Sequence, residues 1–202
     1  IITYEEMLEL AANGAKVLHL RCVEYARRSG TPLRVRSSFT DSPGTLVTTA
    51  EELEGAAVEA PIISGVAHDL GEAKITIAGV RDEPGRAALV FEILATADIN
   101  IDMIVQNVSA AGITDITFTL PMSDGDKAMA VLRGNKNEIG YETVTYDDQV
   151  AKVSLVGAAM RSHPGVSATT FRALADAGIN VEMISTSEIR ISVVVRAEDV
   201  TR

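Results

Sequence analysis

Ala97-Asp-Ile-Asn-Ile-Asp-Met-Ile104, preceded by Asp82-Glu-Pro-Gly-Arg-Ala-Ala-Leu-Val-Phe91, decides the fold of this chain, because both stretches occur twice. The second copies are Ala177-Gly-Ile-Asn-Val-Glu-Met-Ile184 and Ser162-His-Pro-Gly-Val-Ser-Ala-Thr-Thr-Phe171. Each shared Pro-Gly, Phe, Asn and Met-Ile returns 80 positions later in the sequence. A repeat of this length indicates two copies of one supersecondary unit, and therefore a pair of similar domains.

Hydrophobic patterns around the repeat predict the order of its elements. The first copy is expected to form a βαββαβ unit with elements at 74–78, 86–97, 101–108, 115–120, 124–133 and 142–146. The second copy is expected to form βαββ, with elements at 152–156, 166–177, 181–187 and 190–195. Such a shortened unit leaves a sheet edge and a helix face that need cover, either from residues outside this sequence or from another strand such as 62–67.

The residues before the repeat predict a separate N-terminal segment. Thr3 and Glu6 form a capping-box pattern, so we expect a helix from Tyr4 that stops at Asn13-Gly14. The further expected elements are a second helix that ends at Gly30, strands at 33–39 and 45–48, and a linker at 51–59.

Composition limits the possible functions. The chain has 202 residues, 47% of them hydrophobic, and a formal net charge of −10 with a pI near 4.8. A negative charge of this size repels a phosphate backbone, so we expect no nucleic-acid partner. The lone Cys22 allows no internal disulfide, and there is no signal peptide or long apolar run, so we expect a cytoplasmic protein without a membrane partner. Since the chain begins at Ile1 and ends at Arg202, we expect a fragment or the ordered part of a longer protein.

A polar loop precedes the first helix of each repeat. It leads into Pro84-Gly85 in the first copy, where free backbone N–H groups and the helix dipole favour a carboxylate. Asp82 in the same loop offers a carboxylate for an ammonium group. These two features together suit a zwitterion, and a free amino acid is the smallest biological ligand of that kind. The alternative is structural: Asp82 caps the helix and Pro-Gly shapes the turn.

Two further positions recur in both copies. Asn100 and Asn180 follow the first helix of each repeat, and their structural role would be to turn the chain by adopting positive φ. Polar residues then occupy strands where Val or Ile would be expected, namely Gln106-Asn107 and Ser185-Thr-Ser-Glu188. Polarity at matching places in both copies indicates either a shared ligand-binding edge or an interface.

Signals for catalysis or metal binding are missing. There is no phosphate-binding Gly-rich loop, no zinc-protease motif and no Cys pair. His19, His68 and His163 have no ligand spacing, so each is expected to be structural or simply exposed. Cys22 lies on the apolar side of an expected helix and is interpreted as a small core residue.

The repeated strand, Pro-Gly loop, helix and N-I-D-M or N-V-E-M turn resemble tandem ACT domains, which are small ferredoxin-like modules that bind amino acids. The flanking sequence resembles aspartokinases, especially the lysine- and threonine-sensitive actinobacterial kind. The N-terminal stretches that carry this resemblance are Tyr4-Glu-Glu-Met-Leu-Glu-Leu-Ala, Gly14-Ala-Lys-Val-Leu, Val23-Glu-Tyr-Ala and Pro32-Leu-Arg-Val-Arg-Ser-Ser-Phe. Those in the repeats are Gln106-Asn-Val-Ser, Thr114-Asp-Ile-Thr-Phe-Thr, Tyr146-Asp-Asp-Gln-Val and Ile184-Ser-Thr-Ser-Glu-Ile-Arg-Ile-Ser.

This resemblance implies an α+β fold, an α/β sandwich of tandem ferredoxin-like ACT domains that follows the tail of an amino-acid-kinase catalytic domain. The implied domains are the kinase tail at 1–50, a linker at 51–60, the first ACT domain at 61–148 and an incomplete second ACT domain at 149–202. Aspartokinases phosphorylate L-aspartate with ATP. The half that would use ATP and Mg is missing here, so we expect this chain to be inactive alone and to need no cofactor.

The resemblance also implies effector sites for L-threonine or L-lysine where ACT domains pack side by side. In the first copy the implied residues are Asp82, Asn100, Ile101, Asp102, Met103, Gln106, Asn107, Ser109 and Thr117. In the second copy they are Ser167, Asn180, Val181, Ser187 and Glu188. The implied partners are a second copy of the chain or another ACT chain in a homodimer or hetero-oligomer, and a catalytic aspartokinase subunit.

Three alternatives remain open. One is a free-standing ACT tandem that senses an amino acid for another enzyme, against which the kinase-like segment from Tyr4 to Phe39 argues. Another is an intact small enzyme, for which no catalytic cluster is found. The third is a purely structural dimerisation module.

Overall fold

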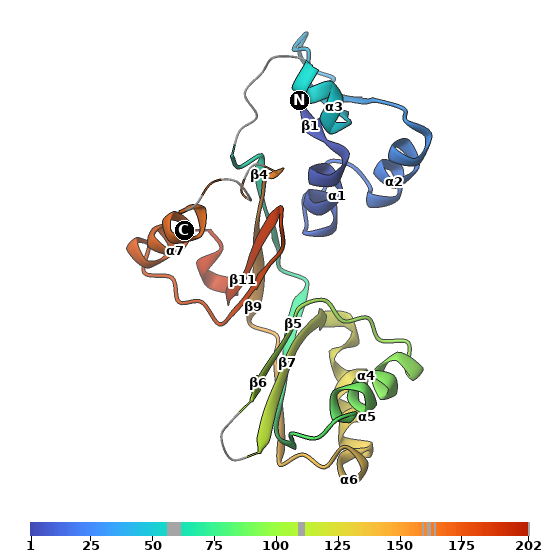
Figure 1. Ribbon diagram of the computed structural model, residues 1–202, viewed down its shortest axis with the longest axis vertical. Helices are drawn as coiled ribbons and strands as arrows, with labels where there is room; N and C mark the ends of the chain where they lie inside the picture. The colour runs from blue at the N-terminus through green and yellow to red at the C-terminus, as the bar shows by residue number, and fades with distance from the viewer. Residues whose placement is uncertain (56–61, 109–111, 159, 161–162, 164, 202) are drawn as a thin grey trace. The chain divides into compact units, whose positions relative to one another are not determined.

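The computed structural model describes residues 1–55, 62–108, 112–158, 160, 163 and 165–201 (Figure 1). The chain divides into two compact units. One unit combines Ile1–Asp69 with Lys152–Val193, and the other combines Leu70–Ala151 with Val194–Arg202.

The first repeat has the expected βαββαβ order. Its elements are β5 (Glu72–Arg81), α4 (Arg86–Thr96), β6 (Ile104–Val108), β7 (Ile113–Pro121), α5 (Gly125–Gly134) and β8 (Thr143–Asp147). A short helix that the sequence did not predict, α6 (Lys136–Ile139), precedes β8. The four strands form a sheet in the order β6-β7-β5-β8, with its helices on one side (Figure 1). The expected α+β fold is therefore confirmed.

Aliphatic side chains form most of the core between this sheet and its helices, together with aromatic ones such as Phe118 and Tyr141. Ile75, Ile77 and Phe118 on the strands pack with Leu94 on α4, and all four are fully buried. The repeated Phe91 meets Phe118 edge to face, with ring centroids 6.0 Å apart. This geometry is favourable for aromatic pairs.

The second repeat contributes β9 (Val150–Val156), α7 (Val166–Asp176), β10 (Met183–Thr186) and β11 (Arg190–Arg196). Its sheet has the order β10-β11-β9-β4, and the fourth strand, β4 (Gly65–Asp69), comes from before the first repeat. β4 runs antiparallel to β9, with Gly65 opposite Val156 and Asp69 opposite Lys152. The expectation that a strand near 62–67 covers the open edge is confirmed, with the strand beginning at Gly65.

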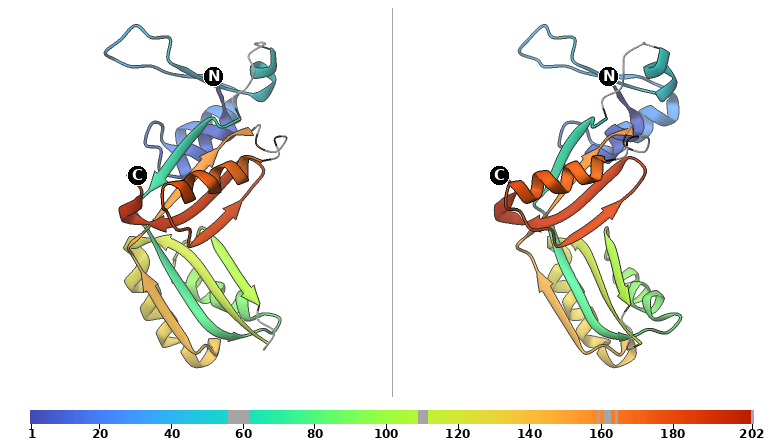
Figure 2. Two further views of the ribbon diagram at one scale, coloured as in Figure 1. Left: turned by 90° about the vertical axis from the view of Figure 1, so that its left-hand side faces the viewer. Right: turned by 60° about the vertical axis from the view of Figure 1, so that its left-hand side comes forward.

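Helices lie on both faces of this second sheet (Figure 1, Figure 2). Neighbouring residues of a strand point to opposite faces. Leu155 lines a cavity together with residues of α7, whereas Val156 packs in a cluster with Leu10 of α1 (Tyr4–Ala12). Gly65 lies so close to α1 that a Cβ there would come within 3.1 Å of the Leu10 side chain. α1 therefore covers the face opposite α7.

The N-terminal segment contains a further sheet in the order β1-β3-β2. Its elements are β1 (Ile2–Thr3), α1, α2 (Leu20–Ser29), β2 (Leu33–Val35), β3 (Thr45–Thr48) and α3 (Ala50–Gly55). The capping box at Thr3 and Glu6 is confirmed, and α2 ends at Gly30 in the left-handed conformation with φ 63°.

Two expectations for this segment are wrong. The strand expected at 33–39 ends at Val35, because its partner β3 pairs only from Val47 to Thr45. The expected linker contains α3 over its first residues, since acidic side chains in a first helical turn favour the helix dipole and Thr49 Oγ1 accepts a hydrogen bond from the Glu52 N–H. Residues 56–60 of that linker lie outside the described ranges.

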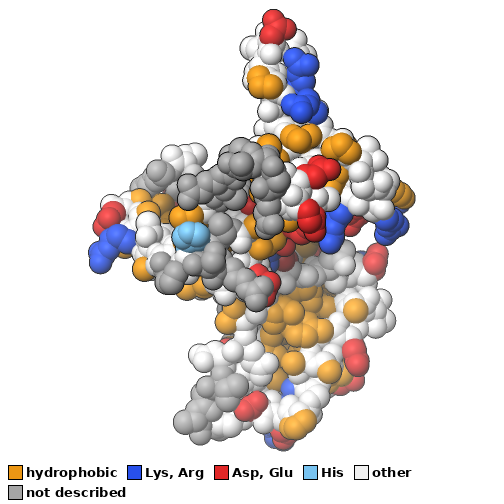
Figure 3. Space-filling model, turned by 45° about the horizontal axis from the view of Figure 1, so that its top comes forward, with side chains coloured by type: hydrophobic (Ala, Val, Ile, Leu, Met, Phe, Trp, Pro, Cys, Tyr) orange, Lys and Arg blue, Asp and Glu red, His pale blue; other side chains and the backbone are white. Residues whose placement is uncertain are grey.

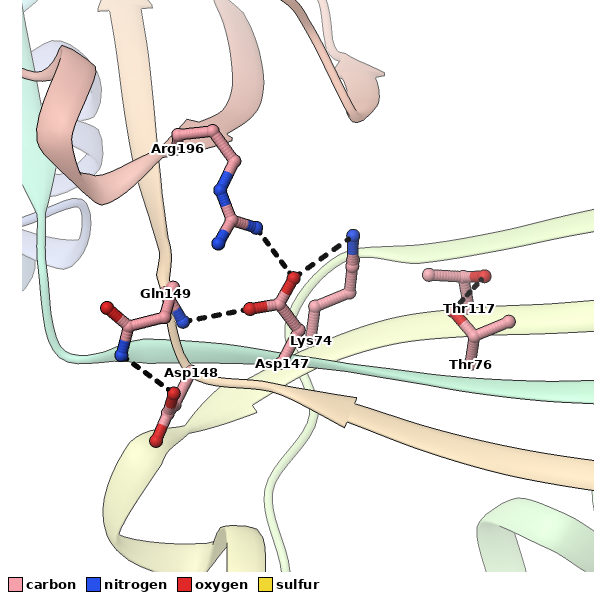
Figure 4. A network of polar contacts seen from close by, with 7 residues as sticks. All are labelled: Lys74, Thr76, Thr117, Asp147, Asp148, Gln149 and Arg196. Atoms are coloured by element: carbon pink, nitrogen blue, oxygen red, sulfur yellow. Dashed lines mark hydrogen bonds and ion pairs between the residues drawn. The ribbon is translucent and has the colours of Figure 1, made fainter.

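A network of polar contacts surrounds Asp147 at the end of β8 (Figure 4). Asp147 accepts hydrogen bonds from Arg196 Nη1 at 2.6 Å and from the Gln149 N–H at 2.9 Å, and Lys74 Nζ lies 3.9 Å from the same carboxylate. Burial by itself raises the pKa of Asp147, but the hydrogen bonds and the charges of Arg196 and Lys74 outweigh it and lower that pKa below its ordinary value.

Candidate functional site

The loop after β5 presents Asp82 at the start of α4. Its side chain is exposed, and its N–H donates to the Gly112 carbonyl at 3.0 Å. The N-cap of α4 is Gly85, with φ 92°, and no side chain caps the helix. The alternative role for Asp82, capping this helix, is therefore not observed.

The polar residues of β6 lie on an edge of the first-repeat sheet. Gln106 stands opposite Ile116 and Asn107 opposite Asp115, and both amide side chains are exposed. Because β6 and β5 both run antiparallel to β7, their final residues lie at the same end of the sheet. Asp82 and the Gln106-Asn107 pair therefore share one end of the sheet.

The residues before β6 lie at its other end. The Asp102 N–H donates to the Thr119 carbonyl at 3.0 Å, and the Met103 N–H donates to Thr119 Oγ1 at 3.1 Å. Met103 is buried, Ile101 is half-buried, and Asn100 is exposed. The predicted residues between 100 and 107 thus lie along the edge strand β6 and the residues before it, with Asp82 at the opposite end, so they do not form one cluster.

The predicted turn role of the two asparagines is wrong. Asp98, with φ 55°, and Gly178, with φ 71°, take the left-handed conformation in the two repeats. Asn100 and Asn180 follow two residues later, and both side chains are exposed.

Thr117 lies on a different face from Gln106. It is half-buried, next to core residues Ile116 and Phe118 on β7, and its hydroxyl is 3.0 Å from that of Thr76 (Figure 4). Since neighbouring strand residues alternate between faces, Thr117 points away from the helices. Ser109 lies outside the described ranges.

The second repeat contains a pocket of about 490 Å³ at the start of α7. Three predicted residues, Ser167, Ser187 and Glu188, line it together. Its remaining lining residues are Met160, His163, Gly165, Val166, Thr186 and Ile191. Asn180 and Val181 do not line this pocket, because they precede β10 whereas Ser187 follows it.

Two loops form the walls of this pocket, which we call the α7 pocket. The loop between β9 and α7 forms one wall, and the turn between β10 and β11 forms the other. The Ser187 N–H donates to the Arg190 carbonyl at 2.8 Å within the turn, and the Gly157 N–H donates to the Ile189 carbonyl at 3.0 Å between the walls. His163, expected to be structural or simply exposed, lines the pocket. Met160 and Ile191 also line it, and they carry no signal in the sequence because they are ordinary apolar residues.

The start of α7 supplies the polar character of the α7 pocket. Its N-cap is Gly165, with φ 103°, which has no side chain to cap the helix. The first intrahelical bond is from the Thr169 N–H to the Gly165 carbonyl, so the preceding N–H groups have no acceptor within the helix. Such a helix start favours an anionic group.

Over the described ranges, no three His, Cys, Asp or Glu side chains come together in a way that could hold a metal ion. Within the same ranges, no helix has the length and apolarity needed to cross a bilayer. On the face drawn in Figure 3, Lys and Arg form small groups interspersed with Asp and Glu.

Comparison with known proteins identifies the repeats. A family model described as ACT domain matches residues 75–135 and 153–202. An aspartokinase from Corynebacterium glutamicum is 56% identical over 200 residues, which cover 98% of this chain and 47% of that protein. The regulatory subunit of aspartate kinase from Thermus thermophilus, in its ligand-free form, is 42% identical with a TM-score of 0.64, covering 68% of this chain and 91% of that one.

The chain belongs to the aspartokinase family. It corresponds to the regulatory ACT region of an aspartokinase, and it spans about half the length of the curated relatives it matches. E. coli aspartokinase III in complex with lysine and aspartate also has this fold, with 26% identity and a TM-score of 0.71, covering 98% of this chain and 42% of that one.

Proposed function

We propose that this chain senses L-lysine or L-threonine and thereby controls the phosphorylation of L-aspartate by ATP. The catalytic half of the enzyme, which uses ATP and Mg, performs that reaction. Residues 1–50 are then the end of the kinase domain, and the chain by itself is inactive. We assign it to the cytoplasm, where amino-acid biosynthesis takes place.

The α7 pocket carries this proposal. It combines a helix start that favours a carboxylate with the Glu188 carboxylate, which suits an ammonium group. A free amino acid has both groups on one carbon atom. The hydroxyls of Ser167 and Ser187 offer hydrogen bonds to the ligand, and a pocket of about 490 Å³ lies in the usual size range for small-molecule sites.

The solved relatives favour a regulatory role with such a ligand. The Thermus protein is a regulatory subunit, and E. coli aspartokinase III was solved with lysine. The unpaired edge of β6, with Asp82 near its end, suits a second ligand-binding edge completed by an ACT sheet of a partner chain. Oligomerisation through ACT domains and association with a catalytic subunit follow from that arrangement.

Calorimetry on the 202-residue chain with L-lysine, L-threonine and L-methionine tests the proposal. We expect saturable binding of lysine or threonine, and a loss of about tenfold or more in affinity for Glu188→Gln and Ser187→Ala, equivalent to about 1.4 kcal/mol. Glu92→Gln, at an exposed position of α4, is the matched control and should bind like the unmodified chain. If none of the three amino acids binds, the sensor proposal is wrong and a dimerisation module becomes the better interpretation.

A further inference from the structure

Glu6 of α1 is a buried carboxylate that does not line the α7 pocket. Only 3% of the residue is exposed. Its Oε2 accepts hydrogen bonds from the Thr3 N–H and hydroxyl, each at 3.0 Å, which is the capping box of its own helix. Its Oε1 accepts two more, from the Ser64 hydroxyl at 2.6 Å and from the Ala158 N–H at 2.8 Å. A helix cap needs only the first pair, so the second pair requires another explanation.

Ala158 belongs to a wall of the α7 pocket. It lies in the loop between β9 and α7, the loop that supplies Met160, His163 and Gly165 to the pocket lining. Among the described residues of this loop, the Met160 N–H donates to the Gly157 carbonyl, and the His163 N–H donates to the Met160 carbonyl. The Glu6 carboxylate therefore holds the start of this loop from outside the pocket.

A second carboxylate of α1 reaches the other wall. Glu9 Oε2 lies 3.3 Å from Arg190 Nη1, and Arg190 closes the turn that holds Ser187 and Glu188. Asn13 adds to this contact, since its Oδ1 accepts from the Ser154 hydroxyl at 3.1 Å and from Arg190 Nη1 at 3.5 Å. One helix thus contacts the backbone of one wall and, on the other, the side chain of the residue whose carbonyl closes the turn.

The hydrogen bonds that Glu6 accepts favour its ionised form. Burial by itself raises its pKa, but the hydrogen bonds that it accepts outweigh burial and lower its pKa below the ordinary value. A charged acceptor forms stronger hydrogen bonds than a neutral one, so the bond to Ala158 is among the stronger contacts of that loop.

We propose that α1 couples the α7 pocket to the rest of the N-terminal segment. Glu6 and Glu9 are the positioning residues of this coupling. The inference rests on the proposed function, because it assumes that the pocket takes an amino acid. Ligand binding requires the two walls to hold a fixed separation, and α1 contacts both of them on the far side of the sheet from α7. By linkage, whatever displaces α1 changes ligand affinity, and ligand binding biases the position of α1 by the same free energy.

Substitutions that remove one contact at a time test this coupling in the 202-residue chain. Glu9→Gln weakens the contact to Arg190, Ser64→Ala removes one donor to Glu6, and Glu6→Gln removes the charge. Glu5→Gln is the control, since the exposed Glu5 lies on the same helix but pairs with Arg27 of α2 at 3.0 Å. We expect the affinity for lysine or threonine to fall about fivefold or more in Glu6→Gln and by a smaller factor in Glu9→Gln and Ser64→Ala. Glu5→Gln should stay within about twofold of the unmodified chain.

Amide hydrogen exchange gives a readout that does not depend on a ligand. In Glu9→Gln and Ser64→Ala, which remove partly exposed groups, we expect faster exchange in the loop after β9 or in the turn before β11, with unchanged exchange in the first-repeat strands. In the unmodified chain, a saturating ligand should slow exchange in α1.

The outcomes separate the two proposals. If the unmodified chain binds lysine or threonine but the affinity is the same in Glu9→Gln and Ser64→Ala as in Glu5→Gln, the coupling is wrong and the sensor stands. Unchanged exchange at both walls in these variants also overturns the coupling. If no amino acid binds while the walls exchange faster, the contacts position the loops but the sensor proposal fails.

Discussion

Arg196 and Asp147 form a close ion pair, with Nη1 and Oδ2 2.6 Å apart. Arg196 ends β11 of the second repeat, and Asp147 ends β8 of the first. The pair therefore joins the last strand of the first repeat to the last strand of the second, across 49 residues of the chain.

Replacing Asp147 with Asn should lower the free energy of unfolding by about 1 kcal/mol, because the pair is only partly shielded from solvent. Urea unfolding followed by circular dichroism measures this change. Asp176→Asn, at the exposed end of α7, is the control and should leave the unfolding midpoint unchanged.

Stability should fall as the solution becomes acidic. The pKa values of Glu6 and Asp147 are lowered from ordinary values of 4.5 and 3.8. Between the native and unfolded pKa values the unfolded chain binds more protons, so a falling pH favours unfolding. The contribution of each group is complete above its ordinary pKa and is lost as the pH falls through its lowered native pKa. Urea midpoints between pH 6 and 3 should therefore decrease, and less steeply in Glu6→Gln; parallel curves for the two proteins would contradict this assignment.

Gly157→Ala should destabilise the α7 pocket. A Cβ at Gly157 would come within 2.1 Å of the Ile62 carbonyl oxygen, so the backbone has to move. We expect a loss of about 1 to 3 kcal/mol in unfolding free energy, typical of an overpacked site, together with weaker amino-acid binding. Gly134→Ala, which meets nothing within 4 Å at the end of α5, is the matched control and should be neutral or slightly stabilising.

Phe118→Ala should cost about 3 to 5 kcal/mol, because its fully buried ring contacts the repeated Phe91 and leaves a cavity when removed. Phe39→Ala removes a side chain that is 95% exposed and should have no measurable effect. Thermal unfolding of both variants gives the comparison. Similar melting temperatures for the two would mean that this core does not limit stability.

Asp82→Ala and Gln106→Ala should reduce the stabilisation of the chain by its effector without unfolding it, since both residues belong to the proposed second binding edge. A thermal shift at saturating lysine or threonine measures this effect. Asp126→Ala, at an exposed position of α5, should retain the full thermal shift. A full shift in the first two variants as well would remove the first-repeat edge from the effector site.

Most of the first repeat could be predicted, because the signals for its helices and strands come from residues that are close together in the sequence. The helix start at Pro84-Gly85, the alternation in β7 and the shared Phe91 each depend on near neighbours in sequence. The short helices α3 and α6 were missed, since a few residues carry too little periodicity to distinguish them from loops.

The site was only partly predictable. Ser187 and Glu188 stood out because polar residues replaced the expected aliphatic ones, and the structure places both at the α7 pocket. His163 did not stand out, since its role depends on a wall formed by residues more than twenty positions away. In the first repeat the residue with left-handed backbone is Asp98 and not Asn100. The sequence could not predict this, because both residue types tolerate that conformation.

The pairing of Asp69 with Lys152 has a further topological consequence. All residues between them, 70–151, leave and return through two adjacent backbone positions of one antiparallel ladder. The whole first repeat is therefore inserted between two paired strands, β4 and β9, at the place where a hairpin turn would otherwise stand.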